Sequence, residues 1–141
     1  MNRILPIVLM LLAGCVQLPP LPGDAQAKRF ESIPDRAVIY VARHVHDKDF
    51  VAPLLLDDEW LGPTYRGTYL RIVVPAGEHR LAGYAGDHGV IRFVTESGKL
   101  YFIDQTTWGF RSLDRSTFEL ADPQYGRTLV LNGTMNDEVI R

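Results

Sequence analysis

The sequence has a single cysteine, Cys15, in 141 residues. One thiol forms no internal disulfide and no zinc site built on several thiolates. A surplus of basic residues is also missing, because 15 Lys and Arg stand against 17 Asp and Glu, for a formal net charge of -2. Domains that bind nucleic acids usually carry a basic patch or stripe. We therefore expect no nucleic-acid partner.

Catalytic motifs and membrane spans are scarce as well. The sequence contains neither a Gly-x-Ser-x-Gly elbow for a nucleophilic serine nor a Gly-Lys-Ser/Thr loop that cradles phosphates. We expect that the protein is not an enzyme. The longest apolar run, residues 4–12, is interrupted by Pro6. It falls short of the ~20 residues that a membrane-spanning helix needs.

The N-terminus has the pattern of a targeting segment. Arg3 precedes the apolar run, which predicts a cleaved signal peptide over residues 1–14. The stretch Leu12-Ala13-Gly14-Cys15 resembles the bacterial lipobox, the sequence read by the lipoprotein maturation pathway. The resemblance implies that Cys15 is acylated on its sulfur, as with palmitate, and becomes the new N-terminus. The alternative is a buried hydrophobic helix that ends in a cysteine.

The resemblance also implies a location. Two or more acyl chains anchor a protein stably, at ~0.8 kcal/mol per buried methylene. The covalent lipid on Cys15 is the only attached group that we expect. Val16, rather than Asp, follows Cys15, and in Gram-negative lipoproteins this favours sorting to the outer membrane. We therefore expect a protein that is lipid-anchored in the bacterial cell envelope, at the outer membrane facing the periplasm.

Residues 15–34 are predicted to form a tether, and residues 35–141 a single folded domain. The stretch Leu18–Asp24 holds three prolines, which lack a backbone donor and have a fixed φ. It should be an extended spacer with a rise of ~3.1 Å per residue. Residues 25–30 can add one helical turn.

The folded domain is predicted to be all-β. Residues 37–43 are β-branched and apolar on both faces, which favours a central strand buried on both sides. Residues 68–74 alternate with the period of two that a strand requires. Turns recur at a spacing of roughly eight to twelve residues, which indicates a β-sandwich or a barrel. The other expected strands cover residues 53–56, 60–62, 79–84, 90–95, 99–105 and 117–121.

Two turns and the C-terminal segment complete this prediction. Residues 57–59 should form the turn of one hairpin, and residues 96–98 should join strands 90–95 and 99–105 in another. The segment 122–141 leaves two possibilities open. Pro123 can start a short helix at its first position, or residues 128–131 can form an edge strand.

The order of strands and turns from Leu54 to Thr106 resembles a known kind of domain. Trp60-Leu61-Gly62, Pro75-Ala76-Gly77-Glu78 and Gly98-Lys99-Leu100-Tyr101-Phe102 carry the resemblance. It is to PEGA-type surface modules and to an uncharacterised domain-of-unknown-function family of small bacterial lipoproteins. The resemblance implies a small transthyretin-like β-sandwich on the envelope and carries no catalytic residues over to this chain.

The strongest candidate for binding is the loop that contains Trp108, Phe110 and Arg111. These residue types are enriched at binding hot spots, and exposed aromatic rings can stack on sugars. The alternative is that Trp108 or Phe110 plugs one open end of the sandwich.

A weaker candidate is a metal site at His44 and His46. Residues i and i+2 of a strand share a face, so both imidazoles can approach one ion. Protein zinc sites usually need three or four ligands, and the alternative is a solvated loop that follows the first strand.

Three functions follow from these candidates. The first is a non-enzymatic envelope lipoprotein, a structural or interaction module that contacts other envelope proteins or the cell wall. The second is a module that binds a small ligand, a glycan or peptidoglycan through residues 108–111. The third is a metal-dependent hydrolase centred on His44 and His46.

Overall fold

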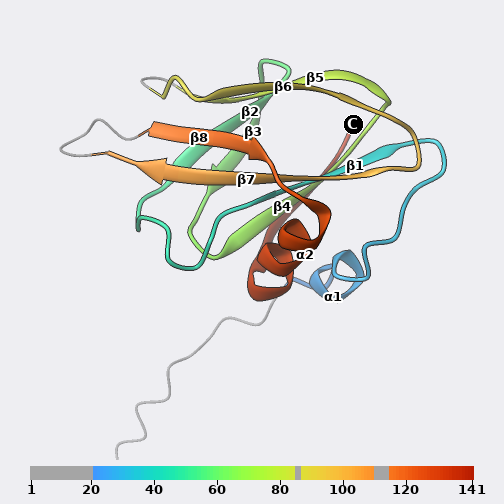
Figure 1. The fold of residues 1–141 in the computed structure, drawn as a ribbon, viewed down its shortest axis with the longest axis horizontal. Helices are drawn as coiled ribbons and strands as arrows, with labels where there is room; N and C mark the ends of the chain where they lie inside the picture. Colours follow the sequence, from blue (N-terminus) through green and yellow to red (C-terminus); the bar gives the residue numbers. More distant parts are fainter. Residues whose placement is uncertain (1–20, 85–86, 110–114) are drawn as a thin grey trace, which may run out of the picture.

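The computed structural model describes residues 21–84, 87–109 and 115–141. Two β-sheets and a layer of two short helices lie on top of one another (Figure 1). The five-stranded sheet has the order β8 (Arg115–Leu120), β7 (Leu100–Trp108), β1 (Ala37–Ala42), β4 (Thr68–Val74) and β9 (Thr134–Ile140). The four-stranded sheet has the order β3 (Glu59–Thr64), β2 (Ala52–Leu56), β5 (Gly77–Gly83) and β6 (Val90–Thr95). The helices are α1 (Asp24–Ala27) and α2 (Pro123–Asn132).

Strand β1 lies at the centre of the five-stranded sheet, as its apolar sequence predicts. It pairs antiparallel with β4 and parallel with β7, and all six of its residues are buried. Side chains at Ile39 and Val41 face the core between the two sheets. Those at Val38 and Tyr40 belong to a second core beneath the helices. Figure 1 shows both helices on the side of the five-stranded sheet that faces away from the four-stranded sheet.

The prediction of a β-rich domain is confirmed in this coarser form: two open sheets, one mixed and one antiparallel, with two short helices beside them. The all-β prediction therefore needs a helix layer added to it. Strands β1 and β4 coincide with the predicted ones almost to the residue.

The predicted hairpin between strands 90–95 and 99–105 is wrong. Strand β6 belongs to the four-stranded sheet, whereas β7 lies beside β1 in the other one. Gly98, at a φ of 76°, makes the turn, and its N–H donates to the carbonyls of Ile33 and Arg36. These contacts with the segment before β1 direct the chain across to β1. The turn residues resemble those of a hairpin, but the chain changes sheets there.

The C-terminal segment forms a helix, which confirms one of its two predicted possibilities. Asp122 caps α2 by accepting hydrogen bonds from the N–H groups of Gln124 and Tyr125. The predicted edge strand over residues 128–131 is wrong, because these residues lie in α2; the strand in this part of the chain is β9. Gly126 faces the sheet, where a Cβ would lie 2.3 Å from the Cβ of Phe102. The helix therefore rests directly on β7.

Helix α1 lies within the predicted tether and packs against the domain. The Asp24 carboxylate accepts hydrogen bonds from the Tyr69 hydroxyl at 2.9 Å and from the Met135 N–H at 2.7 Å. It also pairs with Lys28 at 2.9 Å. The Tyr40 hydroxyl donates to the Ala27 carbonyl at 2.7 Å. The helical turn expected over residues 25–30 thus belongs to the folded body, and the division at residue 34 stays a prediction.

Burial and the hydrogen-bond partners around Asp24 shift the pKa of its carboxyl group. Burial by itself raises the pKa of this carboxyl, but the hydrogen bonds from Lys28, Met135 and Tyr69 outweigh it, and the pKa is lowered. Burial raises the pKa of Tyr69, and its hydrogen bond to Asp24 raises it further. The short helix is therefore held by an ionised carboxylate.

Neither helix is long and apolar enough to cross a membrane, within the ranges that the structure describes. The predicted signal peptide, the lipobox and Cys15 lie outside those ranges.

Candidate functional site

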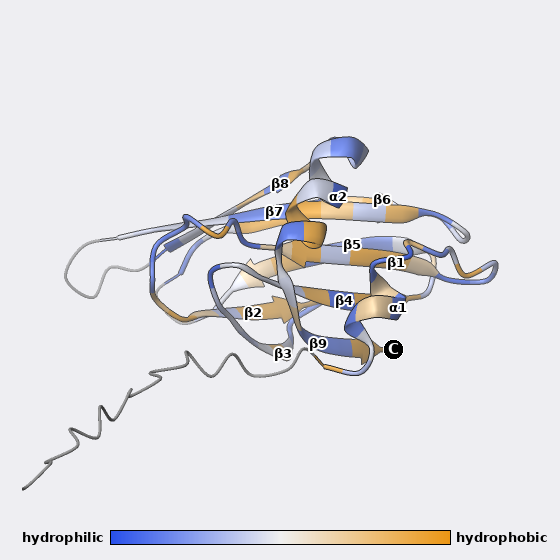
Figure 2. Ribbon diagram, turned by 90° about the horizontal axis from the view of Figure 1, so that it is seen from below, coloured by the Kyte–Doolittle hydropathy of each residue, from blue (hydrophilic) through white to orange (hydrophobic). Residues whose placement is uncertain are grey.

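The candidate site is the outer face of the four-stranded sheet. Helices α1 and α2 contact strands of the five-stranded sheet, and the described helices leave the four-stranded sheet open (Figure 1 and Figure 2). We call this surface the bare face. It is formed by Leu55, Trp60, Glu78, Arg80, Tyr84, Val90, Arg92 and Val94, with the small side chain of Ala82 buried among them.

Alternation along the strands brings these side chains to one side. In β6, Ile91 and Phe93 turn inward, whereas Val90 and Val94 turn to solvent. Val90 lies opposite Ala82 of β5, which in turn lies opposite Leu55 of β2. The register therefore lines up a row of apolar side chains across three strands.

Two aromatic side chains cover one end of the bare face. Trp60 of β3 is 54% exposed, and Tyr84, which follows β5, is 56% exposed. Their ring centroids lie 5.7 Å apart, with an interplanar angle of 78°. This edge-to-face geometry is a favourable one for aromatic pairs. Each ring still offers a large apolar area to a partner.

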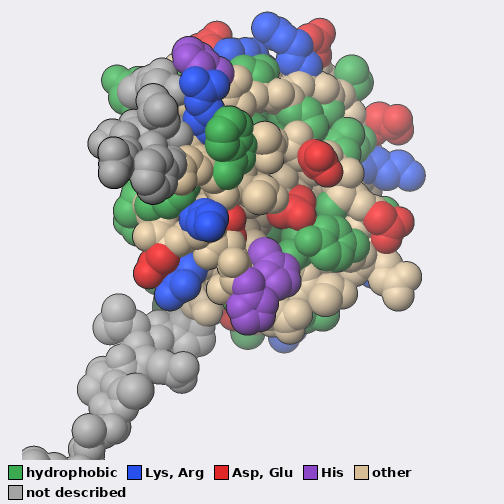
Figure 3. Space-filling model, turned by 60° about the vertical axis from the view of Figure 1, so that its left-hand side comes forward, with side chains coloured by type: hydrophobic (Ala, Val, Ile, Leu, Met, Phe, Trp, Pro, Cys, Tyr) green, Lys and Arg blue, Asp and Glu red, His purple; other side chains and the backbone are tan. Residues whose placement is uncertain are grey.

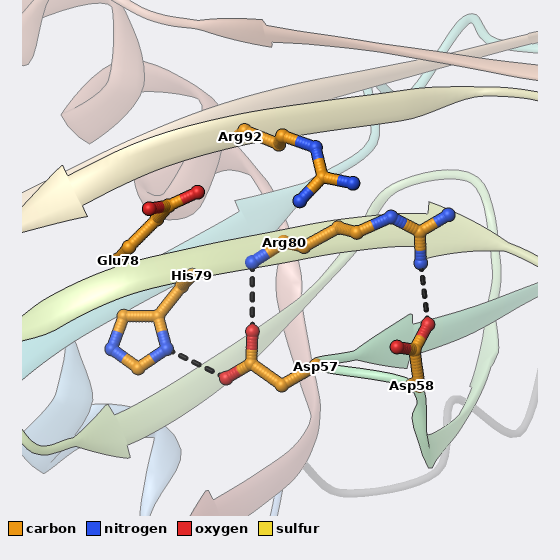
Figure 4. Close-up of a pocket in the computed structure, with 6 residues that line it drawn as sticks. All are labelled: Asp57, Asp58, Glu78, His79, Arg80 and Arg92. Carbon is orange, nitrogen blue, oxygen red and sulfur yellow. Dashed lines mark hydrogen bonds and ion pairs between the residues drawn. The ribbon is translucent and has the colours of Figure 1, made fainter.

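The other end of the bare face is charged and hollowed. Asp57, Asp58, Glu78, His79, Arg80 and Arg92 line a shallow pocket of about 210 Å³ (Figure 4). Asp57 and Asp58 form the two-residue turn between β2 and β3, with φ values of 50° and 67°. Positive φ at both positions is typical of the type I′ hairpin turn, which Asp tolerates. The predicted turn is confirmed at residues 57 and 58, and Glu59 begins β3.

His79 and Asp57 hold the base of this pocket together. The Nδ1 of His79 lies 2.7 Å from the Asp57 carboxylate, and its Nε2 lies 2.9 Å from the Pro75 carbonyl. Both ring nitrogens therefore have a partner within the protein. The second oxygen of Asp57 accepts from the Arg80 N–H at 2.8 Å. His79 is thus engaged in structure rather than free for acid–base chemistry.

Two arginines lie directly opposite each other at the mouth of the pocket. Arg80 of β5 pairs in register with Arg92 of β6. Arg80 forms an ion pair with Asp58 at 2.6 Å, whereas Arg92 has no ion pair or hydrogen bond among the described residues (Figure 4). Like charges in directly opposed positions destabilise a sheet. A guanidinium in this position is suited to bind a carboxylate or another planar anion.

The predicted Trp108 lies at the end of β7, on the other sheet. It is 49% exposed, and the Arg115 guanidinium lies 5.7 Å from its ring centroid. The alternative that Trp108 plugs the sandwich is therefore wrong. Phe110 and Arg111 lie outside the described residues.

His44 and His46 lie side by side in the loop after β1. Their ring centroids are 5.2 Å apart, and the His46 N–H donates to the Nδ1 of His44 at 3.1 Å. Both side chains are exposed, and Figure 3 shows histidine side chains at the surface of the molecule. No group of three or more His, Cys, Asp or Glu that can hold a metal is present in the described part of the chain.

The sequence interpretation missed the buried pair Arg43 and Asp47. The Arg43 side chain is fully buried and binds the Asp47 carboxylate at 2.8 Å. Its guanidinium also donates to the carbonyls of Lys48, Phe50 and Thr64 and to the Thr107 hydroxyl. An arginine that ends an apolar strand, with an aspartate four residues later, was the available signal. The pair fixes the loop and the strand end next to Trp108.

Asp104 is a second polar residue that the sequence interpretation missed. The Tyr125 hydroxyl donates to one of its oxygens at 3.0 Å, and the other oxygen is buried without a partner among the described residues. Burial raises the pKa of Asp104. The residue joins α2 to β7 rather than contributing to the bare face.

No protein-family model, no curated protein and no solved structure matches this chain.

Proposed function

We propose that this protein is a lipid-anchored, non-enzymatic binding module of the bacterial envelope, with a transthyretin- or PEGA-like sandwich as its body. The observation that carries the proposal is the bare face. A small domain that covers one sheet with two helices leaves Trp60, Tyr84 and Val94 exposed on the other. Exposed aromatic side chains next to charged ones are typical of an interaction site.

The residue types of the bare face support binding rather than catalysis. Tryptophan, tyrosine and arginine are the types most enriched among interface residues that dominate binding energy. Here Trp60 and Tyr84 supply apolar area, and Arg92 supplies a charge that has no ion pair or side-chain hydrogen bond to the residues that the structure describes. The partner on this proposal is another envelope protein or the cell wall.

The position of α1 supports an orientation for the anchored domain. Asp24 is nine positions after Cys15, since 24 − 15 = 9. At ~3.1–3.4 Å per residue, nine residues can span at most about 30 Å. Helix α1 lies on the side of the five-stranded sheet that faces away from the four-stranded one (Figure 1). We therefore propose that the helix layer faces the outer membrane, and the bare face points into the periplasm.

Replacement of the lipidated residue tests the anchor. The Cys15→Ser variant should move from the membrane fraction to the soluble fraction, because the acyl chains no longer attach. Continued membrane fractionation of this variant would contradict the anchor.

Removal of the aromatic pair tests the binding surface. The double variant Trp60→Ala/Tyr84→Ala should lose partner crosslinking in cells, since both exposed rings are gone, while its melting temperature stays close to that of the wild type. Leu131→Ala is the matched control, because Leu131 of α2 is 55% exposed on the helix layer. Equal loss of crosslinking in both variants would argue against the bare face.

A second candidate function is favoured by Trp108. A half-exposed tryptophan beside Arg115 offers a stacking surface and a charge, as a glycan or another small ligand requires. Titration with muropeptides and sugars should then quench tryptophan fluorescence in the wild type, but not in Trp108→Phe. Unchanged fluorescence across the panel would remove this candidate.

A further inference from the structure

Strand β6 is an edge of the four-stranded sheet. It pairs with β5 along one side, over six consecutive residues without a register shift. Its sequence, Val90–Thr95, contains β-branched and aromatic residues and no proline or glycine. Such an edge is the kind of strand that pairs readily with another chain.

The alternation of hydrogen bonds along the β5–β6 pair shows which backbone groups of β6 point away from β5. The Gly83 N–H donates to the Gly89 carbonyl at 3.0 Å, so these opposed residues form a hydrogen-bonded pair. Such pairs alternate with non-bonded pairs along an antiparallel ladder. The N–H and C=O groups of Val90, Arg92 and Val94 therefore point away from β5. None of them has a hydrogen-bond partner within the described ranges.

The other edge of the same sheet is obstructed. Strand β3 contains Pro63, which has no N–H, and the Asn136 side chain donates to the Pro63 carbonyl at 2.8 Å. The Arg141 guanidinium donates to the Trp60 carbonyl at 3.4 Å. Residues of β9 and of the C-terminus therefore occupy groups that an added strand would need.

The two edges of the five-stranded sheet are also protected. On β8, the outward N–H of Ser116 already donates to the Asp87 carboxylate at 2.8 Å. Strand β9 has a register shift against β4, between Tyr69 and Leu70, and carries three polar residues in a row, Asn136 to Glu138. Irregularities and charges of this kind discourage edge pairing. Strand β8 approaches the start of β6 near Gly89, where a Cβ would lie 1.9 Å from the Ser116 carbonyl oxygen. Beyond that contact, β6 alone among the described strands combines regular pairing with donors and acceptors that have no hydrogen-bond partner in the described part of the chain.

We propose that β6 takes up an extended segment of a partner protein as a fifth strand of this sheet, with a carboxylate of the partner opposite Arg92. The two opposed arginines favour a partner segment with an acidic side chain. A strand added beside β6 places one side chain next to Arg92, in the row that Arg80 and Arg92 already form. An acidic side chain there offsets the repulsion between the two arginines. A basic one adds a third positive charge.

A second copy of the chain fits the edge less well. If β6 pairs antiparallel with β6 of a second copy, the solvent-facing side chains of both strands must lie on the same face of the joined sheet. Within the strand, Arg92 can then lie opposite only Val90, Arg92 or Val94 of the copy. None of these supplies a carboxylate. The partner strand is thus expected to alternate β-branched residues that face the sandwich with polar and acidic residues that face outward. This inference does not depend on the lipid anchor.

Amide hydrogen exchange with a synthetic probe tests the proposal. The probe is a nine-residue peptide of alternating Val and Thr with a central Glu, and a matched peptide carries Lys instead. In the free protein, the amides of Val90, Arg92 and Val94 should exchange faster than those of Ile91 and Phe93. The Glu peptide should protect the first three. Binding that protects none of them, or no binding at all, would overturn the proposal.

Three variants separate the edge from the surface side chains. Val94→Pro removes one outward N–H without breaking a bond to β5 and should abolish peptide binding, whereas Val94→Thr keeps the amide and should bind normally. Arg92→Glu should reverse the preference, so that the Lys peptide binds about ten-fold more tightly than the Glu peptide. Unchanged preference in Arg92→Glu would contradict the charge argument.

Sedimentation of the same samples tests whether β6 pairs with a second copy of the chain instead. If sedimentation shows a dimer that Val94→Pro abolishes, and the peptides do not bind, the edge belongs to a second copy and the proposal fails. If Val94→Pro does not fold, Arg92→Glu and the exchange pattern of the wild type still decide the question.

Discussion

The two sheets of this domain differ in what lies on their outer faces. On the five-stranded sheet, α1 and α2 cover Tyr40, Tyr69 and Phe102, all of them buried. On the four-stranded sheet, Trp60 and Tyr84 remain more than half exposed. Both faces are rich in aromatic side chains, so composition alone does not distinguish them. The coverage does, and it indicates which face is stabilising and which is available to a partner.

The two faces also differ in whether their polar groups have hydrogen-bond partners within the domain. Beneath the helices, the hydroxyls of Tyr40 and Tyr69 find internal acceptors in α1. On the bare face, the Arg92 guanidinium has none among the described residues. Buried polar groups need partners for stability, whereas an exposed unpaired group is free to bind. The covered face should therefore respond to substitution through stability, and the bare face through binding.

The largest expected effect comes from lifting α2 off its sheet. Gly126→Val should lower the free energy of unfolding by about 3 kcal/mol, because the added side chain overlaps Phe102. Chemical denaturation measures the change. Gln124→Ala, on the exposed side of the same helix, is the control and should change little. A well-folded Gly126→Val variant of normal stability would show that α2 does not rest on β7.

The next effect comes from α1. Asp24→Ala should cost about 2 kcal/mol of stability, since the Tyr69 hydroxyl and the Met135 N–H lose their acceptor. Asp24→Asn keeps an acceptor oxygen and should retain more than half of that stability. Denaturation of both variants tests the order, and equal losses would assign the effect to charge alone.

The pH dependence of stability follows from the same carboxyl. The folded pKa of Asp24 is lowered from its ordinary value of about 3.8, so its contribution is present above that value and is lost as the pH falls through the folded pKa. Below pH 4, wild-type stability should therefore fall more steeply than that of Asp24→Asn. Parallel curves for the two proteins would contradict an ionised, buried Asp24.

The smallest effect on stability is expected on the bare face. Trp60→Ser and Tyr84→Ser should each change the free energy of unfolding by less than about 1 kcal/mol, because more than half of each side chain is already in water. Thermal denaturation is the measurement. A loss as large as that of Gly126→Val would make these rings part of the core and remove the contrast between the faces.

The sequence was sufficient to predict where the strands lie, but not which sheet each strand joins. The continuous apolar run of β1 and the alternation of β4 predicted both strands and the central place of β1. The turn at Gly98 did not show that the chain changes sheets, because its contacts with Ile33 and Arg36 are distant in sequence. Such long-range contacts leave no local pattern.

The candidate site was predictable only in part. Trp108 was selected as an aromatic near a strand end, and the structure leaves it half exposed. The bare face was not predicted, because the alternation in β5 and β6 identifies an outer side without saying whether a helix covers it. The docking of α1 rests on the buried Asp24 carboxylate and on the hydrogen bond from Tyr40 to Ala27, in a segment whose prolines indicated an open spacer.

Site-specific photocrosslinking in intact cells tests the difference between the two faces most directly. A photoreactive amino acid replaces either Tyr84 on the bare face or Leu131 on α2, two positions with exposed fractions of 56% and 55%. We predict a crosslinked product of defined mass from position 84 that is absent from position 131. Crosslinking from position 131 alone, or equally from both, would contradict the bare face as the partner-binding surface.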